Sequence, residues 1–179
     1  MKYERYHNKL SLKNKFGRLI WNVCWVLIFR IAFTPYLNFL RINLLRLFGA
    51  KIGKHCKIDN TVKVWAPWNL EVGDLVAIGF DTLIYNPGKV TINNKITISQ
   101  RSHICSASHD FKRTDNPLIT KPIIIEDRAW VAADCFIGMG VTVGQGAVVG
   151  ARAVVFKDIE PWTVVGGNPA KFIKKREFE

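Results

Sequence analysis

Aliphatic residues recur at every sixth position over three stretches of this chain. The longest stretch holds six of them without a slip: Ile125, Val131, Ile137, Val143, Val149 and Val155. Two earlier stretches keep the same spacing and are offset from each other by two residues: Ile52, Ile58, Val64, Leu70 and Val76, then Ile78, Ile84, Val90 and Ile96. A period of six fits neither an amphipathic helix nor an alternating strand, but it is the period of a parallel β-helix built from hexapeptide turns. The pattern predicts an all-β fold of this kind over residues 50–158, in preference to a sandwich of short strands.

We call these regularly spaced aliphatic residues anchors. The residue after an anchor is often small or polar, as at Gly53, Asp59, Glu71, Ala77, Ala132, Gly138, Gly144 and Gly150. In a narrow prism this position lies near a tight corner, where a bulky side chain would crowd the neighbouring coil. The second pattern therefore supports the stacking of coils that the first one predicts.

The six-residue pattern is interrupted once, at residues 106–124, and it ends before residue 159. Residues 106–124 carry no anchor, which predicts a polar excursion loop, and excursions from a rigid scaffold often carry function. Residues 159–179 contain Gly166-Gly167-Asn168-Pro169-Ala170 and a basic tail, and they are predicted to form a C-terminal cap.

Residues 1–49 have a different pattern. An apolar run of 11 residues, Leu19 to Phe29, ends at Arg30, and a second run from Tyr36 to Phe48 follows Thr34-Pro35 and stops at Gly49. Thr-Pro is a typical helix start and Gly a typical helix end, so two helices are predicted. Both runs are shorter than the roughly 20 residues that a membrane span needs.

The net charge of +12 is concentrated in this N-terminal part. Residues 1–54 hold eleven Lys or Arg and one acid, Glu4, and so contribute +10 of the total. Basic charge among Trp and aliphatic residues favours an anionic membrane surface, with Trp21, Trp25, Phe29 and Phe33 as anchors, over nucleic acid. The alternative is that these helices pack on an open end or side of the β-helix, or on a neighbouring subunit.

Composition limits the class of protein. The chain has 179 residues, of which 49% are hydrophobic, so one principal domain with a buried core is expected. Its four cysteines, Cys24, Cys56, Cys105 and Cys135, show no metal-ligand spacing and no secretion signal precedes them. We expect reduced thiols in a cytoplasmic protein, peripheral at the inner membrane face if the helices bind lipid.

Few residues suit catalysis. No phosphate-binding glycine loop and no nucleophile elbow is present. His103 and His109 flank the excursion, but a third ligand for a zinc site is lacking, so no metal is expected. His109, within Ser108-His109-Asp110, is the candidate general base, because imidazole accepts a proton at neutral pH.

Several motifs resemble one protein family. They are Leu45-Arg46-Leu47-Phe48-Gly49-Ala50-Lys51-Ile52-Gly53, Pro67-Trp68-Asn69-Leu70, Ile98-Ser99-Gln100, Ser108-His109-Asp110, Ala129-Trp130-Val131-Ala132, Gly140-Val141-Thr142-Val143-Gly144, Val148-Val149-Gly150-Ala151 and Gly167-Asn168-Pro169-Ala170. From Leu44 to Lys174 the chain resembles the hexapeptide-repeat acetyltransferases, and within them the branch that acts in colanic acid and exopolysaccharide synthesis.

The resemblance implies a left-handed β-helix and a homotrimer with active sites between subunits. It also implies acetyl-CoA as donor and a sugar hydroxyl as acceptor. His109 matches the family's catalytic base and Trp130 its active-site aromatic residue. The other implied donor-site residues are Ala133 and Ala151 along the pantetheine arm, the basic residues Lys157, Lys171 and Lys174 near the nucleotide phosphates, and Asn168-Pro169 closing the last coil.

The acceptor site departs from the family pattern. Related sugar acetyltransferases carry an asparagine upstream of the base, whereas this chain reads Gly79-Phe80-Asp81-Thr82. Asp81 or Asn86 is then the nearest acceptor-binding candidate, together with Ser108 and Asp110 beside the base. An O-acetyltransferase acting on a free or lipid-linked glycan is expected. A non-enzymatic scaffold and a γ-type carbonic anhydrase are the alternatives, and an acyl group larger than acetyl stays open.

Overall fold

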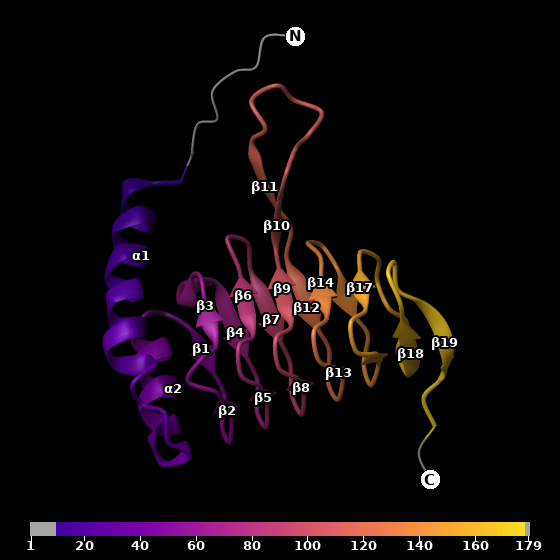
Figure 1. The fold of residues 1–179 in the computed structure, drawn as a ribbon, viewed down its shortest axis with the longest axis horizontal. Coiled ribbons are helices and arrows are strands. Elements are labelled where there is room, and N and C mark those ends of the chain that lie inside the picture. Colours follow the sequence, from indigo (N-terminus) through magenta and orange to yellow (C-terminus); the bar gives the residue numbers. More distant parts are fainter. Residues whose placement is uncertain (1–9, 178–179) are drawn as a thin grey trace.

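Three short parallel sheets form the walls of a β-helix in the computed structural model, which describes residues 10–177 (Figure 1). Two helices cover its N-terminal end, and a hairpin projects from one edge. Residues 1–9, which include the basic residues Lys2, Arg5 and Lys9 and also His7, lie outside the described residues.

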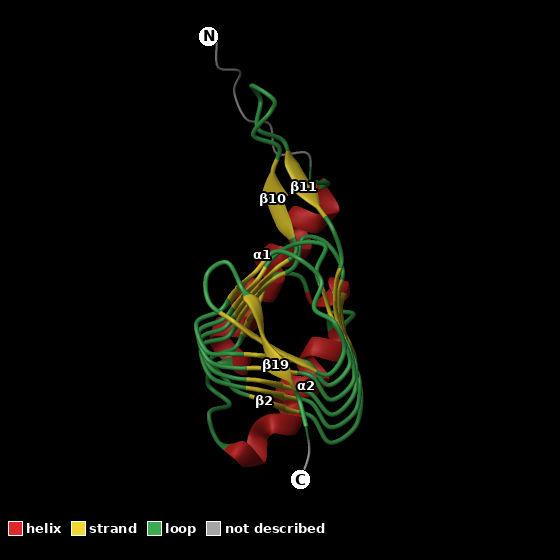
Figure 2. Cartoon of the chain, turned by 90° about the vertical axis from the view of Figure 1, so that its right-hand side faces the viewer, coloured by secondary structure: helices red, strands yellow, loops and turns green. Residues whose placement is uncertain are grey.

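Each of the first five coils contributes one strand to each wall, and Figure 2 shows the coils stacked in a view along the axis. Wall A contains β1 (Lys51–Ile52), β4 (Leu70–Val72), β7 (Val90–Ile92), β12 (Ile123–Ile125) and β15 (Thr142–Val143). Wall B contains β2 (Lys57–Ile58), β5 (Ala77–Ile78), β8 (Thr97–Ile98), β13 (Trp130–Val131), β16 (Val148–Val149), β18 (Thr163–Gly166) and the antiparallel β19 (Lys171–Lys175). Wall C contains β3 (Lys63–Val64), β6 (Leu83–Tyr85), β9 (His103–Cys105), β14 (Phe136–Ile137) and β17 (Val154–Val155).

The predicted anchors form the core, and every one of them is buried. Ile52, Val72 and Ile92 are stacked at intervals of 20 residues, whereas Ile125 and Val143 are 18 apart. The early coils therefore hold two extra residues, and in the first coil these lie near the short helix η3 (Pro67–Asn69). This explains the offset of two between the early runs, because the anchors of both runs point inward.

The N-terminal cap consists of α1 (Leu12–Cys24), the π-helical η1 (Trp25–Phe29), the 3-10 turn η2 (Pro35–Leu37) and α2 (Asn38–Leu47). Ser11 caps α1 by accepting a hydrogen bond from the Asn14 backbone N–H. Pro35 begins the second helical stretch, and Gly49 follows it with a φ of +91°, a conformation that favours glycine. The predicted pair of helices is confirmed.

The cap saturates the open edge of the first coil on all three walls. Trp21 Nε1 donates to the Val64 carbonyl at 2.6 Å, Arg41 Nε to Ile58 at 2.8 Å, and Arg46 Nη2 to Ile52 at 2.8 Å. Trp25 Nε1 and Asn38 Nδ2 satisfy the carbonyls of Val62 and Cys56, both at 2.8 Å. An uncovered sheet edge would leave these carbonyls unpaired or open to another chain.

These contacts correct the membrane anchors expected from sequence. Trp21 and Phe29 are completely buried, and Trp25 is partly buried against the core. They face the β-helix because its end needs apolar cover and hydrogen-bond donors. Phe33 is the exception, with 72% of its surface exposed. The alternative, packing on the open end of the β-helix, is therefore confirmed for the inner face of the cap.

Replacing Trp21 with Phe tests the role of this hydrogen bond. The variant keeps most of the buried ring but leaves the Val64 carbonyl unpaired, so we expect the free energy of unfolding to fall by about 1–3 kcal/mol. Urea denaturation followed by circular dichroism measures it, and Phe33→Leu, at an exposed site, serves as the control. Equal midpoints for Trp21→Phe and the wild type would show that the hydrogen bond adds nothing.

Candidate functional site

The excursion is a β-hairpin that leaves the edge between walls C and A. Its strands are β10 (Ala107–His109) and β11 (Leu118–Thr120), which pair antiparallel with His109 opposite Leu118. The coil resumes at Ile123, which is fully buried and pairs with Val90, two residues before the predicted restart. The hairpin stands well clear of the stack (Figure 1), so its side chains can reach beyond their own coil.

His109 ends the first hairpin strand and has an exposed side chain. Its Nδ1 lies 2.6 Å from the backbone carbonyl of Asn116. A carbonyl oxygen only accepts, so this bond places the proton of the neutral ring on Nδ1 and the basic lone pair on Nε2. Sequence reasoning missed Asn116, because any residue supplies a carbonyl. The only signal was its type, since asparagine tolerates the positive φ of 43° found there.

The neighbours of His109 have different surroundings. Ser108 is exposed and, by strand alternation, lies on the opposite face of the hairpin from His109. One carboxylate oxygen of Asp110 accepts the Lys112 backbone N–H at 3.1 Å, and the Asp110 N–H donates to Pro117. Asp110 thus tightens the tip of the hairpin that holds the histidine.

Two predicted donor-site residues lie together on the edge between walls B and C. Ala133 and Ala151 occupy the same corner in successive coils, where the Arg152 N–H donates to the Ala133 carbonyl at 2.9 Å. Their small side chains leave this edge low. Trp130 comes from the adjoining wall B, where it is 45% exposed and its Nε1 donates to Ser99 Oγ at 3.1 Å.

Charged residues follow the same edge. Arg101 forms a two-pronged ion pair with Asp134, with N–O distances of 2.7 and 2.9 Å. Hydrogen bonding to Arg101 lowers the pKa of Asp134, and the same bond raises the pKa of Arg101. Asp81 lies close enough to Arg101 to add to that rise. Asp81 is exposed, as an acceptor-binding residue would need to be.

Asn86 does not fit the acceptor role suggested for it. Its side chain is fully buried, its Oδ1 accepts the Ala66 N–H at 2.9 Å, and its Nδ2 donates to the Ala66 carbonyl at 2.8 Å. The amide supports the wider corner of an early coil. A sugar could reach it only by breaking both buried bonds, so we leave Asn86 out of the acceptor site.

Three of the remaining candidates share a cavity at the C-terminal end of the stack. Lys157, Pro169 and Lys171 line a hollow of about 440 Å³, together with the acids Asp158 and Glu160. Asn168 is exposed and joins Pro169 through a cis peptide bond. Lys174 is exposed on β19 but does not line the cavity.

Within one chain, the candidate base and the alanine corner lie on different edges of the prism. The hairpin connects wall C to wall A, whereas Ala133 and Ala151 lie where wall B turns into wall C. The fold therefore groups Ala133 with Ala151, and Lys157 with Pro169 and Lys171. Within one chain it places His109 beside neither group.

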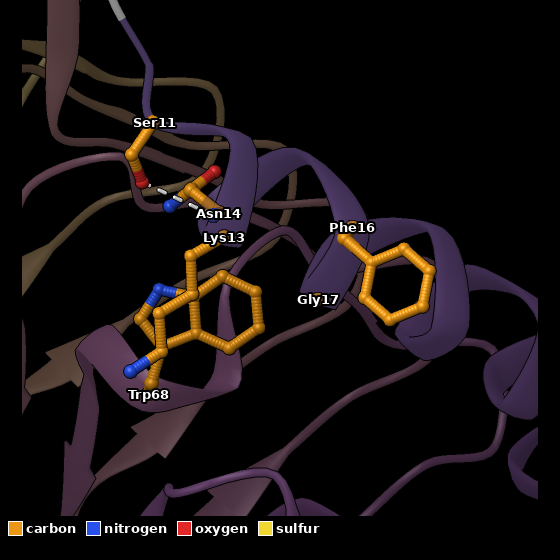
Figure 3. Close-up of a pocket in the computed structure, with 6 residues that line it drawn as sticks. All are labelled: Ser11, Lys13, Asn14, Phe16, Gly17 and Trp68. Atoms are coloured by element: carbon orange, nitrogen blue, oxygen red, sulfur yellow. Dashed lines mark hydrogen bonds between the residues drawn. The ribbon is translucent and has the colours of Figure 1, made fainter.

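Two other hollows lie nearer the cap. One, of about 610 Å³, is formed by Ser11, Lys13, Asn14, Phe16, Gly17 and Trp68, between the start of α1 and η3 (Figure 3). The other, of about 630 Å³, runs along wall B from the cap to Ser99 and Gln100. The second one reaches the residue that holds Trp130, whereas the first contains none of the predicted site residues.

His103 projects outward from wall C against Phe136, with ring centroids 5.3 Å apart. Burial lowers the pKa of His103, and its Nε2 has no hydrogen-bond partner among residues 10–177. Among the described residues, no group of three or more His, Cys, Asp or Glu side chains has a geometry that suits a metal ion.

The lowered pKa of His103 predicts a loss of stability in acid. Above the ordinary histidine pKa of about 6.5 the ring is neutral in both the folded and the unfolded chain. In that range His103 does not reduce the free energy of unfolding. As pH falls below that value, the unfolded chain binds the proton first and the free energy of unfolding decreases. The decrease ends once pH passes the lower folded-state pKa.

We therefore expect His103→Leu to lose less stability than the wild type between about pH 7.5 and pH 5. Urea midpoints at several pH values measure this, with His55→Gln, at an exposed corner, as the control. Parallel pH profiles for His103→Leu and the wild type would refute the assignment.

Comparison with known proteins places these features in a wider group. No family model matches the chain. WcaF of Escherichia coli K12, whose name assigns it provisionally to acetyl transfer in colanic acid biosynthesis, is 42% identical over 136 residues, or 76% of this chain and 75% of WcaF.

Solved structures share the fold. The hexapeptide-repeat acetyltransferase VCA0836 of Vibrio cholerae superposes with a TM-score of 0.84 at 25% identity, covering 94% of this chain and 95% of VCA0836. Its complex with acetyl-CoA gives 0.84 at 24% identity, covering 97% and 94%. A maltose O-acetyltransferase of Clostridium difficile gives 0.82 at 25% identity, covering 94% and 90%.

Proposed function

This chain belongs to the hexapeptide-repeat acetyltransferases, the family that includes WcaF, and on that premise we propose that it transfers an acetyl group from acetyl-CoA to a sugar hydroxyl of a surface glycan. The observation that carries the chemistry is the tautomer of His109, which has Nε2 as its basic nitrogen. Family membership sets aside the non-enzymatic scaffold.

His109 is the proposed general base. Its Nε2 takes the proton of the acceptor hydroxyl as the oxygen attacks the thioester carbonyl of acetyl-CoA. The tetrahedral intermediate, with its oxyanion held by a backbone N–H, collapses to the sugar acetate and CoA thiolate, and His109 returns the proton to the sulfur. No acyl-enzyme is needed, because both substrates are held together.

The donor is proposed to lie along the edge formed by Ala133 and Ala151, with Trp130 beside it. Small side chains on successive corners let a thin pantetheine arm lie flat on the coils. The C-terminal hollow with Lys157 and Lys171 offers positive charge to the nucleotide phosphates, with Lys174, Asn168 and Pro169 nearby. Asp81, Ser108 and Asp110 remain the proposed acceptor contacts.

We propose that the site is shared between subunits of a homotrimer. His109 and the alanine corner lie on different edges of one prism, which supports a site in which a neighbouring chain supplies one of them. The projecting hairpin can reach the B–C edge of that neighbour and exclude water there. The cytoplasm, where acetyl-CoA is made, is the proposed location.

A thiol-release assay tests the reaction. Acetyl-CoA is offered with free, nucleotide-linked and lipid-linked sugars, and release of CoA thiol should depend on one acceptor class. Butyryl-CoA in place of acetyl-CoA tests the size of the acyl group. No acceptor-dependent release with any of these sugars would reject the proposed acceptor class.

Mixing two inactive variants tests the shared site. His109→Ala and Ala151→Trp are unfolded together and refolded, so that mixed oligomers form. If each site takes its hairpin and its groove from different chains, about a quarter of the sites in a random mixture are intact and activity returns. A mixture as inactive as its parents would show that both groups come from one chain.

A further inference from the structure

The outer surface of the N-terminal cap is apolar. Its inner surface is a separate region, which packs on the first coil and donates hydrogen bonds to it. Within the described residues, no helix is long and apolar enough to cross a bilayer. Yet the cap exposes large hydrophobic side chains over its whole length: Leu12, Phe16, Leu19, Ile20, Val23, Val26, Leu27, Ile28, Ile31, Phe33, Tyr36, Phe39, Leu40 and Leu47. We call these residues the cap surface. So many exposed large apolar side chains in one segment are rare on a protein that contacts only water.

The part of the cap surface that belongs to α1 lies on one side of that helix. At 100° per residue, Leu12, Phe16, Leu19, Ile20 and Val23 fall within an arc of about 100°. Trp21, on the opposite side, is fully buried against the first coil. The helix is thus apolar on two opposite sides. Packing on the first coil explains the inner side, but nothing in the described part of the fold covers the outer side.

Basic residues border this arc. Lys13 and Lys15 flank it on either side at the same helical spacing, and both are exposed. Arg30 is exposed at the end of η1, with its guanidinium 5.6 Å from the Trp25 ring. By contrast, Arg41 and Arg46 point inward to the first coil. An apolar strip between two cations fits the boundary between acyl chains and anionic headgroups.

Charge also decides between a membrane and a second copy of the cap. Residues 10–50 contain six Lys or Arg and no Asp or Glu. Two caps packed face to face would bring Lys13, Lys15 and Arg30 against the same cations, with no acid in either segment to offset them. An anionic lipid surface supplies the missing negative charge.

We propose that the cap surface rests on an anionic lipid bilayer, with α1 lying in the plane of the headgroups and the β-helix axis pointing away from the membrane. Both helices lie at the N-terminal end of the stack (Figure 1), so one contact engages the whole cap. The hydrophobic side chains enter the acyl boundary, and Lys13, Lys15 and Arg30 contact headgroup phosphates. This goes beyond acetyl transfer and is independent of the acceptor.

Vesicle flotation of the full chain tests the proposal. Vesicles of phosphatidylcholine alone are compared with vesicles that also contain phosphatidylglycerol, at low and high salt. The protein should float with the anionic vesicles at low salt and be partly released by high salt. Failure to float with them at low salt would overturn the proposal.

Variants then locate the contact. Leu19→Asp combined with Leu27→Asp changes two exposed positions and should reduce the bound fraction at least about tenfold. Lys13→Gln combined with Lys15→Gln should weaken binding to anionic vesicles several-fold, with unchanged thermal unfolding. Ile173→Asp, at an equally exposed apolar site on β19, should bind as the wild type does. Wild-type binding by the Leu19, Leu27 variant would mean that another surface holds the lipid.

Two further measurements separate membrane binding from self-association and from enzyme activity. Sedimentation without lipid shows whether the Leu19, Leu27 variant forms a smaller assembly than the wild type, in which case a second chain covers the cap and the proposal is wrong. Thiol release from acetyl-CoA in the same samples reports the proposed enzyme activity separately. If the double aspartate variant does not fold, the lysine pair and the salt dependence of the wild type still decide.

Discussion

His109→Ala is expected to lower kcat by about 10²–10⁴-fold, the usual contribution of a general base. Loss of Nε2 leaves the acceptor hydroxyl protonated as it attacks, while acetyl-CoA still binds. The Kd for CoA, measured by calorimetry, should therefore stay within about twofold of the wild type, because the change falls on the transition state. Thiol release under saturating acetyl-CoA gives kcat.

His55→Ala is the matched control, since it removes an exposed imidazole at a coil corner away from the hairpin. Its kcat should not change. Because His109 is held through the Asn116 carbonyl, Asn116→Pro should also lower kcat, since proline cannot adopt the positive φ of this position in the turn before β11. Activity of His109→Ala within tenfold of the wild type would remove the histidine from the mechanism.

Ala151→Trp is expected to weaken CoA binding by at least about 100-fold, because the indole would occupy the surface along which the pantetheine arm is proposed to lie and overlap of this size cannot be relieved locally. Ala151 is exposed at its corner, so the new ring projects outward and the fold should survive. Calorimetry with CoA measures the affinity, and thermal unfolding checks the fold.

Gln145→Trp provides the control within the same coil. Gln145 is an exposed corner residue six positions earlier, on the edge between walls A and B. The same ring placed there should leave CoA affinity unchanged. If both variants bind CoA equally well, the donor groove lies on another edge of the prism.

The cap shows why its function could not be read from composition alone. Trp21, Trp25, Arg41 and Arg46 have the residue types of a membrane anchor, yet each donates a hydrogen bond to a first-coil carbonyl. The sequence contains no sign of this, because the acceptors are backbone groups that become unpaired only when the β-helix begins. The structure separates these inward residues from the cap surface.

In the candidate site, too, residue types were visible in the sequence, whereas their contacts were visible only in the structure. The residue type and loop position of His109 were visible in the sequence, but the carbonyl that orients its ring was not. Asn86 looked like a polar acceptor contact until the fold buried it between Ala66 N–H and C=O. A polar side chain has the same letter whether it faces a substrate or closes a corner.

The sequence by itself determined the β-helix, because each wall is built from local hexapeptides whose anchors must all point inward. Ile125 to Val155 needed no long-range information to be placed, and all six are buried. Only the tertiary structure decided which edge each functional candidate occupies. The two extra residues in each early coil and the hairpin between walls C and A set that arrangement. Edges are formed by residues about one coil apart, so their grouping depends on how the coils stack.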